Sequence, residues 1–199
     1  MALLRSLIRV FSGYARLQYS IEQRGRETPA VLTDPANVPY ADESNVLNAV
    51  SLTSEYIAHE HGDEGMFATL FFGIIDPLTG SLAYVNGGHE PLIVLSKDGI
   101  KHRLKPTGPA VGMMPGSYYK IETVQLEPGD ILFGYTDGVT EARSPQDSLY
   151  TRRRFEDAVV SFRLPTAVEC IENVKSDLFA FIQNAPQADD ITMLAVRYK

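Results

Sequence analysis

The stretch MFATLFFGIIDPLTGSLAYVNGGHEPLIVL, residues 66–95, decides the fold class of this chain. It contains three short apolar runs that are rich in β-branched and aromatic residues. Turn residues separate the runs, namely Asp76-Pro77, Thr79-Gly80 and Asn86-Gly87-Gly88. Strands that follow one another through such short turns predict antiparallel hairpins.

The same pattern continues on the C-terminal side of this stretch. We expect strands at residues 66–75, 81–85, 92–95, 100–104, 118–126, 131–135 and 191–198. Helical spacing of apolar residues comes before the first of these strands and again before the last. The expected order is therefore helix, helix, strands, helix, helix, strand, which is no βαβ alternation. Helices packed on stacked antiparallel sheets, an α+β fold, fit this order best.

Four helices are expected. The first starts at the N-terminus on an apolar stripe from Leu3 to Ala15, and the second includes Val46 to His61, with Ser44 or Asp42 as its cap. The third is indicated by Phe155, Ala158, Val159 and Phe162, and the fourth by Val168, Ile171, Val174, Leu178 and Ile182. The polar, proline-containing residues 25–43 predict a long mobile loop.

Composition and charge exclude several classes of protein. The chain has 199 residues, of which 44% are hydrophobic and 22% charged, so one globular domain over 1–199 is expected. A net charge of −7 argues against a nucleic-acid partner. No apolar run approaches the length of a membrane helix. The single Cys170 excludes an internal disulfide and suits a reducing compartment, so a cytoplasmic location is expected.

Two carboxylate motifs lie at expected strand ends. Asp137, in Tyr135-Thr136-Asp137-Gly138-Val139, follows one strand directly, and Gly138 lets the backbone approach a ligand closely. Taken alone, Asp-Gly after a strand is also an ordinary turn. Asp189 and Asp190 precede the last strand, and two adjacent carboxylates repel each other unless positive charge lies nearby. They are read either as ligands of a divalent cation or as a solvated turn.

If the two strands are neighbours, Asp137, Asp189 and Asp190 come together. With a third carboxylate they could hold Mg²⁺ or Mn²⁺ and lower the pKa of a bound water. A further candidate is the loop Asn86-Gly87-Gly88-His89, in which Asn86, Gly88 and His89 could contact a substrate or phosphate. The alternative for His89 is a structural hydrogen bond.

Four segments in order carry a resemblance to a known family. They are residues 66–95, then PTGPAVGMMPGSYYK, LEPGDILFGYTDGVTEAR and ADDITMLAVR. Together they resemble the bacterial PPM-type (PP2C-like) serine/threonine phosphatases of the SpoIIE/RsbU class, from about Met66 to Lys199. The resemblance implies an α-β-β-α sandwich in which two Mn²⁺ or Mg²⁺ ions activate the water that attacks phosphoserine or phosphothreonine.

The resemblance also implies roles for particular residues. Asp137 would be a metal ligand, Asp189 the second, with Asp190 as the alternative for that position. Implied substrates are phosphorylated antagonists of anti-sigma factors in a bacterial stress or signalling circuit. A homodimer is an alternative that the sequence leaves open.

The chain departs from the family pattern at its start. The family's first strands and a metal-bridging aspartate in a Gly-Asp motif have no counterpart here, and that aspartate would lie before Met1. We therefore expect the polypeptide alone to be a poor phosphatase. The alternative to an enzyme is a catalytically degenerate phosphatase fold that binds a phosphoprotein without turnover.

Overall fold

The computed structural model describes residues 43–161 and 166–199, and they form two compact units. Of these residues, 43–89 and 106–125 belong to the first unit, and 90–105, 126–161 and 166–199 belong to the second. Each unit contains one antiparallel sheet, and helices accompany both sheets. The predicted α+β class with two antiparallel sheets is confirmed. That residues 1–199 make one domain stays a prediction.

The sheet of the first unit has three strands in the order β1-β2-β5. The strands are β1 (Leu70–Ile75), β2 (Ser81–Gly87) and β5 (Glu122–Gln125). Strands β1 and β2 form the expected hairpin, with Phe72 opposite Val85. Asp76 holds its turn, because its carboxylate accepts hydrogen bonds from the Leu78 N–H at 2.9 Å and the Thr79 hydroxyl at 2.7 Å.

Helix α2 (Glu43–Glu60) supplies the other half of this unit's core, and the one-turn η2 (Gly62–Glu64) follows it. The buried apolar residues are Val46, Val50, Ile57, Val85, Val111 and Tyr119. Ser54 is buried among them and accepts hydrogen bonds from the Gly112 N–H and the Tyr119 hydroxyl. The buried hydroxyl of Ser54 therefore has hydrogen-bond partners, as buried polar groups require.

The sheet of the second unit has four strands in the order β4-β3-β6-β7. They are β3 (Leu92–Ser96), β4 (Gly99–Leu104), β6 (Ile131–Tyr135) and β7 (Met193–Arg197). All neighbouring pairs are antiparallel, and β6 lies between β3 and the C-terminal β7. Residues far apart in sequence therefore meet at the ends of β6 and β7.

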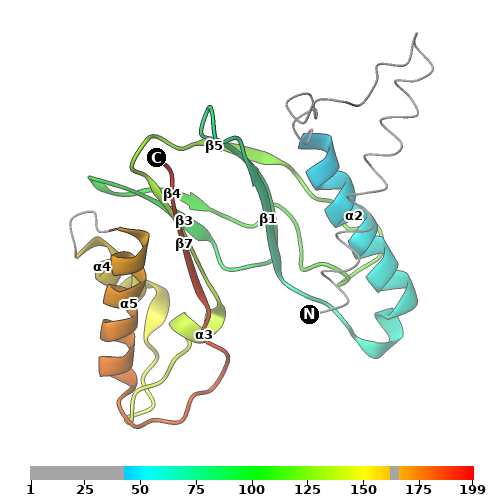
Figure 1. Cartoon of the computed structure of the whole chain (residues 1–199). Coiled ribbons are helices and arrows are strands. Elements are labelled where there is room, and N and C mark those ends of the chain that lie inside the picture. The colour runs from blue at the N-terminus through cyan, green and yellow to red at the C-terminus, as the bar shows by residue number, and fades with distance from the viewer. Residues whose placement is uncertain (1–42, 162–165) are drawn as a thin grey trace, which may run out of the picture. The chain divides into compact units, whose positions relative to one another are not determined.

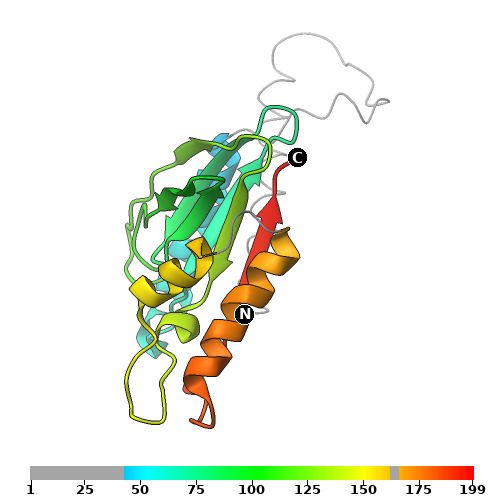
Figure 2. The same ribbon diagram turned by 90° about the vertical axis from the view of Figure 1, so that its left-hand side faces the viewer.

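Three helices belong to the second unit: α3 (Asp137–Thr140), α4 (Thr151–Val160) and α5 (Ala167–Ile182). Phe155 of α4 and Val174 and Leu178 of α5 are fully buried against Ile131 and Phe133 of β6. Helix α5 runs alongside β7 (Figure 2). Thr166 begins α5 through a capping box with Glu169, which satisfies free N–H groups at the helix start.

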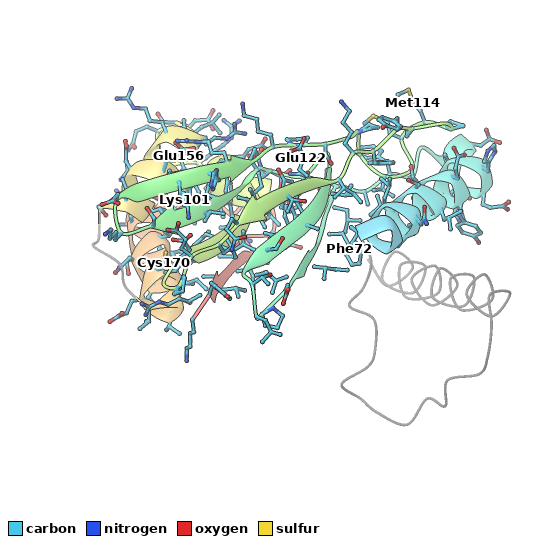
Figure 3. All side chains as sticks on the ribbon, turned by 90° about the horizontal axis from the view of Figure 1, so that it is seen from above. Phe72, Lys101, Met114, Glu122, Glu156 and Cys170 are labelled. Carbon is cyan, nitrogen blue, oxygen red and sulfur yellow. The ribbon has the colours of Figure 1, made fainter. Side chains whose placement is uncertain are left out.

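The structure corrects several expected details. Strand β1 begins at Leu70, because Met66 and Phe67 are exposed, and β5 covers only four residues of the expected 118–126. Helix α2 begins at Glu43, so Ser44 lies at its second residue and does not precede it. The expected stripe of α5 is wrong at Val168, which is 69% exposed, while Cys170 is buried in its place (Figure 3).

Some expectations fall outside the described residues. They are the N-terminal helix, the loop at residues 25–42, the cap at Asp42 and the contribution of Phe162. Within the described ranges, no helix combines the length and apolar character that crossing a bilayer requires.

Candidate metal-binding site at the ends of β6 and β7

The two carboxylate motifs lie at the same end of the β6–β7 pair. Tyr135, the last residue of β6, is opposite Met193, the first residue of β7. Asp137 follows β6 by two residues, and Asp190 precedes β7 by three. In Figure 1 the start of β7, in red, lies beside α3. The prediction that neighbouring strands bring the motifs together is confirmed.

Thr136 joins the two motifs directly. Its hydroxyl donates to the Asp190 carbonyl oxygen at 2.8 Å and accepts from the Thr192 N–H at 3.0 Å. Its own N–H donates to the Thr192 carbonyl oxygen at 3.1 Å. Sequence reasoning missed this role. The available signal was a threonine close to the acidic residues in both motifs: Thr136 directly before Asp137, and Thr192 two residues after Asp190.

Gly138 allows the motifs to come this close. A Cβ atom at this position would lie 2.5 Å from the Asp190 carbonyl oxygen and 3.0 Å from its carbonyl carbon. Both contacts are with backbone, which cannot move aside as a flexible side chain can. The residue after Asp137 therefore has no side chain for a packing reason, and Gly138 itself is buried.

Asp137 is the first residue of the one-turn helix α3, with Thr136 as the N-cap residue. The local backbone is a helical turn, because the Glu141 N–H donates to the Asp137 carbonyl oxygen at 2.8 Å. Asp137 Oδ1 accepts from the Gly138 N–H at 3.0 Å. Asp137, Asp189 and Asp190 are all exposed, so their carboxylates remain accessible.

The segment before β7 has its own local bonds. Asp189 Oδ1 accepts from the Asp190 N–H at 2.7 Å, and the Gln187 side chain donates to the Asp189 carbonyl oxygen at 2.8 Å. The first bond restrains the carboxylate of Asp189, and the second restrains its backbone. Such restraint lowers the conformational entropy that ligand binding would cost.

The donor chemistry of the site suits a hard divalent cation, since Mg²⁺ and Mn²⁺ prefer carboxylate oxygen. The set is partial. Within residues 43–161 and 166–199, no group of three or more His, Cys, Asp or Glu side chains is placed to hold a metal ion. That Asp137 and Asp189 are ligands of a cation stays a prediction.

A buried tyrosine and two partly exposed charged residues support the end of β6. The Tyr135 side chain is 3% exposed, and its ring packs on Phe155 with centroids 4.0 Å apart. Its hydroxyl lies 3.4 Å from Glu90 Oε2, which also accepts from Arg152 Nη2 at 2.8 Å. Burial raises the pKa of Tyr135 to about 12, so the hydroxyl keeps its proton. This contact fixes the strand end from which Asp137 follows.

The third candidate set, Asn86, Gly88 and His89, belongs to the first unit. Asn86 is fully buried, and its side-chain oxygen accepts from the His89 N–H at 2.8 Å. Gly88 has φ +71°, and a Cβ there would lie 2.8 Å from the Ala110 nitrogen. These contacts give Asn86 and Gly88 a structural part in the loop. Substrate contact by this loop stays a prediction.

Three comparisons place these features among known proteins. The sequence profile of the family described as Stage II sporulation protein E (SpoIIE) matches residues 28–199. The chain is 45% identical to protein IcfG of Synechocystis sp. over 207 residues, covering 98% of this chain and 30% of IcfG. It is 27% identical to the phosphoserine phosphatase RsbU of Bacillus subtilis, covering 72% of this chain and 42% of RsbU.

Among solved structures, the SiaA PP2C domain of Pseudomonas aeruginosa has the same fold, with a TM-score of 0.66 at 22% identity. The match covers 100% of this chain and 70% of that domain's chain. This chain spans less than half the length of IcfG and of RsbU.

Proposed function

Because the chain belongs to the SpoIIE family, we propose that it is a metal-dependent protein phosphatase that removes phosphate from phosphoserine or phosphothreonine. The observation that carries the proposal is the junction of the two motifs at the ends of β6 and β7. Gly138 and Thr136 join the Asp137 motif to the Asp189-Asp190 motif, although more than fifty residues separate them.

Asp137 and Asp189 are the residues proposed to hold Mn²⁺ or Mg²⁺, with Asp190 as the alternative to Asp189. A bound divalent cation of this kind lowers the pKa of a water molecule and so supplies a nucleophile at neutral pH. The chain's own part is to hold two carboxylates on one short, hydrogen-bonded junction. Thr136, the residue before Asp137, forms two hydrogen bonds to the segment of Asp190 and Thr192, and these bonds hold the backbones of the two motifs together.

The proposed substrate is a phosphorylated regulatory protein, of the kind that antagonises an anti-sigma factor. The name of RsbU, a phosphoserine phosphatase, supports the reaction type. The exposure of all three aspartates suits a protein substrate, since the phosphorylated side chain can reach them from solvent.

The test is Mn²⁺-dependent hydrolysis of p-nitrophenyl phosphate, together with Mn²⁺ binding by isothermal titration calorimetry. Asp137→Asn and Asp189→Asn are each expected to weaken Mn²⁺ binding and to lower the rate at least tenfold, because a neutral amide is a poorer ligand than a carboxylate. Asp98→Asn is the matched control, since Asp98 is exposed in the turn between β3 and β4.

Equal Mn²⁺ affinity in the wild type, Asp137→Asn and Asp189→Asn would refute the assignment of these residues. Circular dichroism of each variant shows whether the fold is kept. An absence of Mn²⁺ binding in the wild-type chain would overturn the metal-dependent mechanism.

A second candidate is a phosphatase fold that binds a phosphoprotein without turnover. The partial ligand set among the described residues favours it. It predicts binding of a phosphoserine peptide with no hydrolysis at saturating Mn²⁺, which measurement of released phosphate decides.

A further inference from the structure

An open groove of about 510 Å³ lies on the second unit. One wall consists of Arg143, Ser144, Pro145 and Asp147, in the loop that follows α3, and the other wall consists of residues 184–188, in the segment that follows α5. In Figure 1 these two segments run side by side below α3. A groove of this volume accommodates a few residues of an extended peptide.

One wall of the groove ends beside the candidate metal-binding site. Ala188, at the end of one wall, directly precedes Asp189. A small hollow shares Arg143 and Ala188 with the groove, and its lining also includes Gly138, the residue after Asp137. A peptide that placed a phosphorylated side chain at Asp137 and Asp189 would therefore lay neighbouring residues along this groove.

Arg143 is the residue in the groove with unused binding capacity. Its side chain is 46% exposed, and Nη1 donates to Asp147 Oδ1 at 2.7 Å. Within the described part of the chain, its Nε and Nη2 groups make no hydrogen bond. A guanidinium offers five N–H donors in a planar fork that matches a carboxylate, so most of this capacity is free.

Asp147 is the only other charged residue that lines the groove in the described ranges. Its side chain is 80% exposed, and exposed ion pairs four residues apart are weak. An incoming carboxylate can therefore share Arg143 or displace Asp147. The chain carries a net charge of −7, so a positive side chain in the groove offsets part of the repulsion that an acidic peptide meets.

We propose that this groove binds the segment of a phosphoprotein that flanks the phosphoserine, and that Arg143 binds an acidic side chain of that segment. The proposal rests on the proposed function, because the phosphoserine itself must reach Asp137 and Asp189. Proline and alanine on the walls, at Pro145, Ala185, Pro186 and Ala188, leave room for the peptide backbone. The positive charge of Arg143 then favours substrates with an acidic side chain near the phosphoserine over substrates without one.

The test is fluorescence anisotropy with two labelled phosphoserine peptides of equal length. One carries aspartate on both sides of the phosphoserine, and the other carries asparagine at the same positions. The wild type is expected to bind the aspartate peptide more tightly. Arg143→Gln should raise the Kd of the aspartate peptide about tenfold and change that of the asparagine peptide less than about twofold, because only the first loses a charge-assisted hydrogen bond.

Arg153→Gln is the matched control, since Arg153 is exposed on α4 outside the groove. Asn184→Asp is a second variant that keeps the shape of the groove and adds a negative charge to its wall. It should weaken binding of the aspartate peptide and have a smaller effect on the asparagine peptide.

Equal affinity of the wild type for the two peptides would overturn the proposal, and so would an unchanged Kd in Arg143→Gln. These binding results do not depend on turnover. Loss of Mn²⁺ binding or hydrolysis in the wild type would refute the proposed function alone, whereas loss of charge selectivity with intact hydrolysis would refute the groove alone.

Discussion

Replacing Gly138 by alanine tests whether close packing of the two aspartate motifs builds the site. The new Cβ would lie 2.5 Å from the Asp190 carbonyl oxygen, 3.0 Å from the Asp190 carbonyl carbon and 3.4 Å from that of Asp189. Ordinary van der Waals contact begins at 3.4 Å, so the Asp190 backbone must retreat by about 0.9 Å. This movement would lengthen the hydrogen bonds that the Thr136 hydroxyl forms with Asp190 and Thr192.

The expected loss of unfolding free energy is about 2 kcal/mol. Overpacking by one methyl group costs about 1–3 kcal/mol, and the weakened hydrogen bonds add about 1 kcal/mol. Alanine recovers about 0.5–1 kcal/mol, because it loses less backbone entropy than glycine in a helix. With a urea m-value of about 2 kcal/mol/M, the midpoint of unfolding should fall by about 1 M.

The assay combines urea unfolding, followed by circular dichroism, with Mn²⁺ binding by calorimetry. A displacement of about 1 Å in a ligand segment is expected to weaken binding or catalysis by up to about 100-fold. Gly62→Ala is the control, because a Cβ at Gly62 has no atom within 4 Å. An unchanged midpoint together with unchanged Mn²⁺ affinity in Gly138→Ala would refute the reasoning about the junction.

Three further predictions concern the second unit. The Arg154 guanidinium donates hydrogen bonds to Asp177 and holds the pKa of that carboxyl below its usual range. Ionised Asp177 therefore stabilises the fold above the ordinary carboxyl pKa, and this stabilisation is lost as the pH falls through the folded-state pKa. In urea unfolding between pH 7 and about pH 3, the stability of Asp177→Asn should depend less on pH than that of the wild type. Thr151→Gly should raise the unfolding free energy by about 1 kcal/mol, because Thr151 is β-branched with φ +69°, and a lower melting temperature would contradict this. Leu178→Ala should cost about 2–5 kcal/mol because Leu178 is fully buried, whereas Val168→Ala, at a 69% exposed position, should cost less than about 1 kcal/mol.

The outcome for α5 shows where periodicity is ambiguous. Val168, Ile171, Val174, Leu178 and Ile182 form an apolar stripe by sequence, but the buried stripe runs through Cys170 and not Val168. Both residues are apolar, and both fit a helical stripe, because Val168 lies three residues before Ile171 and Cys170 lies four residues before Val174. The way α5 packs in the second unit buries Cys170 and leaves Val168 exposed.

The sequence around Asp137 was also insufficient to predict its backbone conformation. Thr-Asp-Gly after a strand is compatible with a turn or with the start of a helix, since Thr and Asp favour both. The structure contains a helical turn that begins at Asp137. The residue before it, Thr136, is held by hydrogen bonds to Asp190 and Thr192. No window of sequence includes both ends of those bonds.

The sequence by itself determined the α+β class, most strand positions and the ordered motifs of the SpoIIE family, because alternation, turn residues and composition act over short distances along the chain. Only the tertiary structure decided that β6 and β7 are neighbours, that Gly138 packs on the Asp190 backbone and that Thr136 links the two motifs. Strand order depends on which apolar faces are buried together, and that is a property of the whole folded unit.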